Sequence, residues 1–116
     1  MKLTGMQIKK ILEKSVSGKF GMLQISGIKF KYDMNRKAGN RVVEILFNNR
    51  PIKKNKYYKV ATNSFLVKGG DNFNVFTHGK DICDTGIVDR DAEIMYLKKY
   101  PKITAKIEGR IINLTH

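Results

Sequence analysis

Residues 3–16, LTGMQIKKILEKSV, carry a complete helix signature and set the fold class of the chain. Thr4 can cap the helix, and Gln7 three residues later completes a capping box. Leu3 and Ile8 have the spacing of a hydrophobic staple. Four apolar residues then recur at helical spacing: Ile8, Ile11, Leu12 and Val16. This stretch predicts an amphipathic helix with one face in the core.

After Gly18, which ends the predicted helix, the hydrophobic period changes to two. Residues 23–26 and 28–32 alternate and predict one strand with a bulge or two short strands. Residues 33–40 predict a hairpin connection, and residues 41–47 (RVVEILF) predict the next strand. The first half therefore predicts a helix followed by paired strands.

The second half adds a strand, a loop and a second helix. Residues 57–61 predict a strand, and residues 89–100 predict a helix with acids in its first turn and lysines in its last. We expect its core-facing residues to be Val88, Ala92, Met95 and Leu97. A final strand is expected around residues 103–107 and 110–112. This order predicts one α+β domain over residues 1–116, with a mixed or antiparallel sheet packed by both helices.

The composition excludes several classes of protein. A hydrophobic fraction of 41% indicates a folded chain, and no apolar run approaches the roughly 20 residues of a membrane span, so we expect no membrane partner. The first residues lack the apolar core of a signal peptide. One cysteine, Cys83, excludes an internal disulfide, and its apolar neighbour predicts a core position.

The net charge of +13 is unevenly distributed. Residues 1–60 hold 15 lysines and arginines against 3 acids. This excess permits an alternative function as a small basic module that binds RNA or DNA. Its supporting pattern interleaves the aromatics Phe20, Phe30 and Tyr32 with Lys19, Lys29 and Lys31. Against it, Phe30 and Tyr32 share one strand face opposite the lysines, which indicates a core position.

Catalytic patterns are absent from the sequence. The two histidines, His78 and His116, occur in no H-x-H, D-x-H or Asn-His pattern of the kind that pairs metal ligands. No glycine-rich phosphate loop is present. We therefore expect no catalytic residue, no metal site and no cofactor in this chain.

Residues 61–73, ATNSFLVKGGDNF, combine an aromatic ring, two adjacent glycines and an acid. A flat ring can stack on a base, and glycines let a backbone approach a ligand closely. A carboxylate can accept hydrogen bonds from vicinal hydroxyls. The alternative is a Gly-Gly turn between two core phenylalanines, which composition alone favours.

Five segments in order carry a resemblance that covers essentially the whole chain. After residues 3–16 come GKFGMLQISGIKFKYD, GNRVVEILFNNRPI, YYKVATNSFLVKGGDNF and EGRI. Together they resemble the C-terminal domain of the 5′-nucleotidase family, metallophosphatases that include UDP-sugar hydrolases and ecto-5′-nucleotidases. The matching positions include Leu3, Gly5, Ile8, Leu12, Glu13, Ser15, residues 23–32, 41–43 and 58–73.

The resemblance implies roles for residues of the 61–73 segment. Phe65 would stack on one face of the substrate's base, and Asp71 would accept hydrogen bonds from the ribose hydroxyls. Gly69 and Gly70 would shape the loop between them, and Phe73 would pack. Asn72 replaces a common glycine but tolerates the left-handed conformation that the turn needs.

The resemblance also implies what this chain lacks. The family's second stacking aromatic, its phosphate-contacting Asn and Arg, and its two-metal catalytic domain all lie upstream, so we expect a domain truncated at its N-terminal side. It would be a substrate-recognition domain, inactive alone, whose partners are a weakly bound nucleotide or nucleoside and an N-terminal metallophosphatase domain or subunit. The divalent metal pair is expected only in that catalytic domain. The family is usually periplasmic or extracellular, and the sequence leaves the localisation unknown. A third alternative is a free-standing domain that docks on a separate catalytic subunit.

Overall fold

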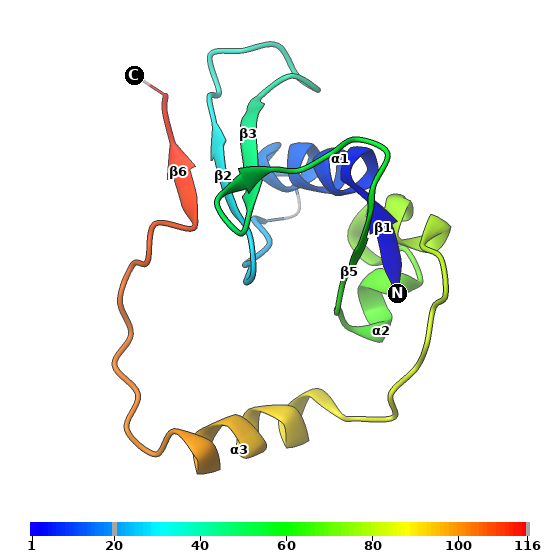
Figure 1. Cartoon of the computed structure of the whole chain (residues 1–116), viewed down its shortest axis with the longest axis vertical. Helices are drawn as coiled ribbons and strands as arrows, with labels where there is room; N and C mark the ends of the chain where they lie inside the picture. Colours follow the sequence, from blue (N-terminus) through cyan, green and yellow to red (C-terminus); the bar gives the residue numbers. More distant parts are fainter. Residues whose placement is uncertain (20, 116) are drawn as a thin grey trace.

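The computed structural model describes residues 1–19 and 21–115 (Figure 1). Its helices are α1 (Gly5–Val16), α2 (Ser64–Val67) and α3 (Asp89–Lys99), with short 3₁₀ segments η1 (Gly70–Asn72) and η2 (Asn74–His78). Its strands are β1 (Lys2–Thr4), β2 (Lys29–Tyr32), β3 (Val42–Phe47), β4 (Arg50–Pro51), β5 (Tyr57–Lys59) and β6 (Ile111–Asn113). No helix in the described part of the chain is long and apolar enough to cross a bilayer.

The strands form two sheets. The larger has the order β4-β3-β2-β6, in which β2 and β3 are antiparallel and β6 runs parallel to β2. The smaller pairs β1 with β5, antiparallel, with Leu3 opposite Tyr58. The turn from β3 to β4 places Asn48 and Asn49 at φ of 52° and 60°, as tight hairpin turns require. The predicted α+β class with a mixed sheet is confirmed.

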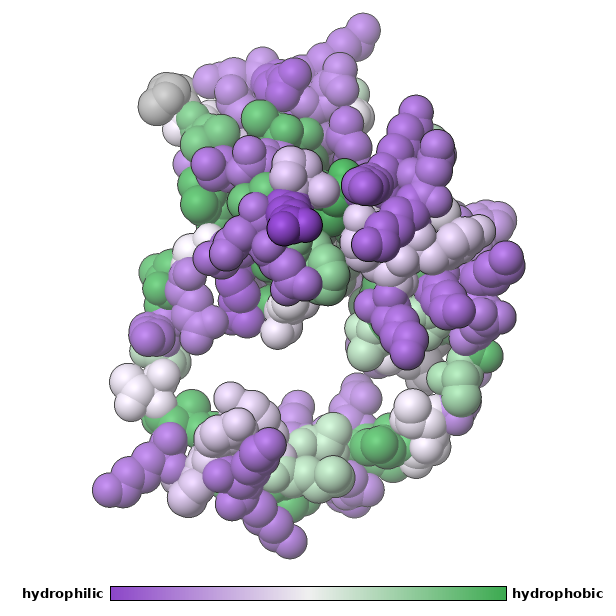
Figure 2. All heavy atoms as spheres, in the orientation of Figure 1, coloured by the Kyte–Doolittle hydropathy of each residue, from purple (hydrophilic) through white to green (hydrophobic). Residues whose placement is uncertain are grey.

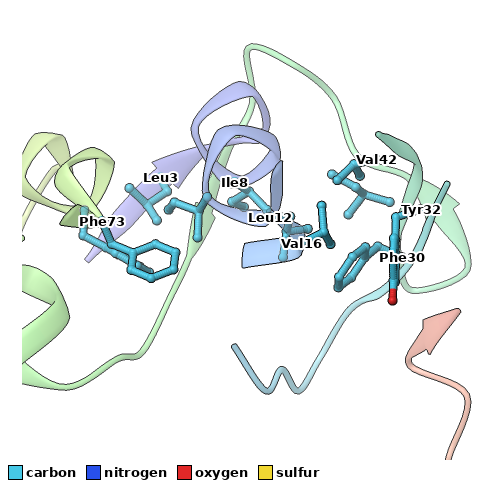
Figure 3. Close-up of a cluster of buried hydrophobic side chains, with 11 residues drawn as sticks. Leu3, Ile8, Leu12, Val16, Phe30, Tyr32, Val42 and Phe73 are labelled. Atoms are coloured by element: carbon cyan, nitrogen blue, oxygen red, sulfur yellow. The ribbon is translucent and has the colours of Figure 1, made fainter. Parts of the chain in front are cut away.

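Helix α1 forms as its sequence predicts and fills the core. The Thr4 side chain accepts a hydrogen bond from the Gln7 backbone N–H, while the Gln7 side chain accepts one from the Thr4 N–H. The apolar stripe faces the sheet, so that α1 lies between Phe73 at one end of the core and Phe30 and Tyr32 at the other (Figure 3). The buried hydrophobic residues are Leu3, Ile8, Ile11, Leu12, Val16, Phe30, Tyr32, Val42, Ile45, Phe73 and Phe76.

Two polar side chains of α1 bind backbone of later segments. The Glu13 carboxylate accepts hydrogen bonds from the backbone N–H groups of Arg41 (3.1 Å) and Val42 (2.6 Å), where β3 begins. The fully buried Ser15 hydroxyl accepts one from the Leu23 N–H at 2.8 Å. Residues 23–26 run along this contact without sheet pairing, so the strand predicted there is wrong and only its second half, β2, forms.

Residues 82–108, which we call the arm, are exposed throughout. Helix α3 lies within the arm and stands apart from the sheets and α1, and the space-filling view shows an opening between them (Figures 1 and 2). We call residues 1–80 together with β6 the body.

Three predictions fail in the arm, and they share one physical reason. Helix α3 forms where predicted, but Val88, Ala92, Met95 and Leu97 are exposed instead of facing the core. The strand predicted at residues 103–107 is absent, Ile107 is 98% exposed, and Cys83 is exposed rather than buried. Apolar residues are buried only where another surface packs against them, and the described residues provide no such surface for the arm.

Candidate functional site

The short helix α2 positions Phe65 at the edge of the body. Asn63 begins it, because its side-chain oxygen accepts a hydrogen bond from the Leu66 N–H at 2.9 Å. The Lys68 N–H donates to the Ser64 carbonyl and the Gly69 N–H to the Leu66 carbonyl, which closes the turn. Phe65 sits in the first turn and is 56% exposed.

The backbone of Gly70 supports the ring of Phe65. A methyl carbon placed at Gly70 would lie 2.5–2.6 Å from the Cζ, Cε1 and Cε2 atoms of Phe65. Nearly equal distances to these three atoms put that point over the ring face, not beyond its edge. One face therefore rests on Gly70, where only glycine leaves room, and the exposed surface of the ring belongs mainly to the other face.

Asp71 lies in a left-handed stretch directly after this contact. Gly69, Asp71 and Asn72 have φ of 84°, 53° and 60°. Asn72 thus adopts the conformation that it was predicted to tolerate. Asp71 is exposed, and no side-chain hydrogen bond or ion pair to its carboxylate is formed within residues 1–19 and 21–115. The carboxylate is free to accept hydrogen bonds from a ligand.

Phe73 anchors this loop in the core. It is 2% exposed, its ring lies 6.3 Å from that of Phe76, and its N–H donates to the Gly70 carbonyl. The packing predicted for Phe73 is confirmed. The alternative of a turn between two core phenylalanines requires Phe65 to be buried as well, and it is not.

The structure therefore places Phe65, Gly69, Gly70 and Asp71 on one short segment that runs from α2 into η1, with the ring and the carboxylate both open to solvent. Sequence reasoning missed the residue that orients this loop, Asn63. The signal was available, because an asparagine just before a short helical stretch is a typical cap, and Asn63 lies two residues before an apolar run.

The aromatic residues proposed for nucleic-acid stacking occupy other environments. Phe30 and Tyr32 are buried in the core, as their strand face predicted. Lys31 pairs with Glu44 at 3.7 Å on the opposite face. Phe20 lies outside the described residues.

No metal centre is found within the described residues, where no three His, Cys, Asp or Glu side chains gather. His78 is exposed at the end of η2, and His116 lies outside the described residues.

Comparisons with known proteins agree with the resemblance seen in the sequence. The family model described as 5′-nucleotidase, C-terminal domain, matches residues 1–78. The trifunctional nucleotide phosphoesterase YfkN of Bacillus subtilis is 38% identical, a match that covers 94% of this chain and 8% of that protein. The 5′-nucleotidase of Bos taurus is 36% identical over 96% of this chain and 21% of its own length.

A solved structure shares the fold. The 5′-nucleotidase precursor of Thermus thermophilus is 32% identical and superposes with a TM-score of 0.89, over 98% of this chain and 24% of that chain. The chain spans only 8% to 22% of the first curated relatives that it matches. It corresponds to the C-terminal part of the curated 5′-nucleotidases. This chain belongs to the 5′-nucleotidase C-terminal domain family.

Proposed function

We propose that this chain recognises the nucleoside part of a nucleotide for a 5′-nucleotidase-type phosphohydrolase. Phe65 stacks on the base, Asp71 accepts hydrogen bonds from the ribose hydroxyls, and Gly69 and Gly70 shape the loop between them. The observation that carries the proposal is the Phe65 ring, which has one face supported by Gly70 and the other open.

The chemistry of the two groups suits a nucleoside. Stacking on an aromatic face tolerates any base, because every base has a π-face. An ionised carboxylate only accepts hydrogen bonds, and vicinal ribose hydroxyls can supply two donors to it. The core contact of Phe73 holds both groups on one short loop, which limits the entropy lost when a ligand binds.

These contacts limit the affinity of the isolated chain. One stacking contact contributes about 1–3 kcal/mol, and a hydrogen bond to a charged group about 1.5–3 kcal/mol. Micromolar binding requires about 8 kcal/mol. The isolated chain should therefore bind adenosine or AMP with a Kd near the millimolar range, on the order of 4 kcal/mol.

An NMR titration with adenosine and AMP tests the site. We expect shift changes at residues 63–73, their loss in Phe65→Ala, and a similar loss in Gly70→Ala because the added methyl displaces the ring. Phe47→Ala is the matched control, since Phe47 is also an exposed phenylalanine of the body. Shift changes that persist in Phe65→Ala, or that centre on Phe47, would contradict the proposal.

The role of Asp71 is tested with two ligands, one with ribose hydroxyls and one without them. Asp71→Asn should weaken binding of adenosine but leave binding of 2′,3′-dideoxyadenosine unchanged, because the second ligand lacks the hydroxyls. If Asp71→Asn weakened the binding of both ligands equally, Asp71 would not be a contact of the ribose hydroxyls.

We further propose that catalysis belongs to an N-terminal metallophosphatase domain, which would hold the divalent metal pair, and that this chain alone is inactive and needs no cofactor. AMP incubated with the purified chain and Mn²⁺ or Mg²⁺ should release no phosphate above a buffer blank. Release that survives removal of contaminating phosphatases would overturn this part.

The excess of positive charge on residues 1–60 leaves nucleic-acid binding as the second candidate function. The aromatic residues that supported this function, Phe30 and Tyr32, are buried in the core and do not present a ring face to a base. Titration with an oligonucleotide at two salt concentrations separates the candidates, since binding through phosphates weakens steeply with salt.

A further inference from the structure

The arm, residues 82–108, presents most of the exposed apolar surface of the described chain. Among the described residues, seventeen large hydrophobic side chains are exposed, and ten of them lie in the arm. These ten are Ile82, Ile87, Val88, Ile94, Met95, Tyr96, Leu97, Tyr100, Ile103 and Ile107. A concentration of this kind marks a surface that another polypeptide or a ligand covers.

The arm is fixed at both ends, so it is not a loose tail. At its start, Lys80 and Lys2 exchange two backbone hydrogen bonds of 2.7 and 2.8 Å next to β1. At its end, the chain enters β6, which pairs in parallel with β2. The arm thus spans from the smaller sheet to the larger one and closes a loop around the opening seen in Figure 2.

Helix α3 lacks the means to be stable in this position by itself. It has 11 residues and buries none of them. Isolated helices shorter than about 12–15 residues are marginal in water, and helices in proteins owe their stability chiefly to packing. Ile94, Met95, Tyr96 and Leu97 are consecutive and therefore point to several sides of the helix. A partner that covers α3 on more than one side suits this pattern.

The Thermus thermophilus structure indicates where that partner comes from. A TM-score of 0.89 over 98% of this chain requires that the arm superposes too, because the arm is nearly a quarter of the residues. The stand-off position of the arm is therefore shared with a protein in which about three quarters of the chain lies outside the match. Matches to the curated 5′-nucleotidases fall at their C-terminal part, so in those proteins the additional polypeptide precedes the matched region.

Charge also favours a protein surface over a nucleic acid. The arm holds five basic and five acidic residues and is neutral, whereas residues 1–80 hold 17 basic and 4 acidic residues. A neutral apolar surface has no attraction for phosphates and suits a protein contact.

We infer that the arm is a docking surface for the polypeptide that precedes the matched region in the longer 5′-nucleotidases. The apolar side chains of α3 and its flanks close around that polypeptide, and α3 becomes stable when it is covered. This inference rests on the family and the exposed arm, and it holds whether or not Phe65 and Asp71 bind a nucleoside.

The test adds a defined partner to the full 116-residue chain. The partner is the region of the Thermus thermophilus protein that precedes its match to Met1. Light scattering should show a one-to-one complex, and hydrogen exchange should show protection of the arm amides that rises at least about tenfold on mixing. A dye on Cys83, the single and exposed cysteine, gives the affinity.

Two substitutions test whether the complex forms through the arm. Leu97→Asp should weaken the complex at least about tenfold, since it puts a charge into a covered apolar contact. It should leave the thermal unfolding of the isolated chain unchanged, because Leu97 is 51% exposed there. Val43→Asp is the control, an exposed apolar residue of the body whose substitution should leave the complex intact.

Four outcomes overturn the inference. The first is that the chain dimerises alone and its arm is protected in that dimer, and the second is that α3 amides exchange slowly in the isolated monomer. The third is that no complex forms with the added region at high micromolar concentration. The fourth is that a complex forms but is weakened by Val43→Asp and not by Leu97→Asp. The first outcome would assign the surface to a second copy of this chain.

Discussion

Helices α1 and α3 have nearly equal lengths, 12 and 11 residues, and opposite surroundings. Helix α1 buries its apolar stripe against the sheet, whereas α3 buries nothing. Both carry the local signals that start and stop a helix, such as the capping box of α1 and the acidic first turn of α3. The comparison shows that local signals place a helix along the chain, while burial depends on a surface elsewhere.

The difference between the helices also has a source in the pattern. The apolar residues of α1 recur at three- and four-residue spacing and define one face. Those of α3 are consecutive at residues 94–97 and define none. A helix without a preferred apolar face does not dock on a single sheet, so α3 lies outside the core that α1 builds.

The largest expected effect is at Leu12, the buried leucine of α1. Leu12→Ala should lower the free energy of unfolding by about 2–5 kcal/mol, because it removes a fully buried side chain and leaves a cavity. Urea unfolding followed by circular dichroism measures the change. Leu12→Met, which nearly conserves the volume, should cost less than about 1.5 kcal/mol. Similar costs for both variants would argue against tight packing around α1.

Glu13 gives the next largest effect, since it ties α1 to the start of β3. Glu13→Ala leaves the N–H groups of Arg41 and Val42 without their carboxylate acceptor and should cost about 1–3 kcal/mol. Glu13→Gln keeps one acceptor oxygen and should cost less. The same urea unfolding series measures both. If Glu13→Ala were as stable as the unchanged chain, these contacts would add nothing to the body.

Asn63 should have a smaller and more local effect. Asn63→Ala removes the cap of α2 and should cost about 1 kcal/mol, felt mainly as faster amide exchange at residues 64–68. Asn63→Asp keeps an acceptor at this position and should restore slow exchange. Unchanged exchange in Asn63→Ala would mean that the core contact of Phe73 holds the loop without the cap.

Much of the body could be predicted from the sequence because its signals are local. Thr4 and Gln7 form a capping box that predicts the start of α1. The alternation of Phe30 and Tyr32 with lysines predicts the buried face of β2. The prediction of a strand at residues 23–26 was wrong because the Leu23 N–H donates a hydrogen bond to the Ser15 hydroxyl instead of to a neighbouring strand. Hydrophobic periodicity does not reveal a tertiary contact of this kind.

The candidate site could be located but not described from the sequence. The order of ring, glycines and acid in residues 61–73 pointed to the loop. The face-on contact of Phe65 with Gly70 depends on a backbone path through left-handed residues, which no pattern specifies. The arm was misjudged for a different reason, because its apolar residues were assigned to a core that the described chain does not build around them.

Leu97 supplies the smallest expected effect and the sharpest contrast with Leu12. It is the same residue type on a helix of similar length, but 51% exposed against 2%. Leu97→Ala should change the free energy of unfolding of the isolated chain by no more than about 0.5 kcal/mol, as exposed positions do. Alanine is also the better helix former, so any cost cannot come from helix propensity. A loss above about 1 kcal/mol in the isolated chain would require Leu97 to be packed, and α3 would then belong to the same folding unit as α1.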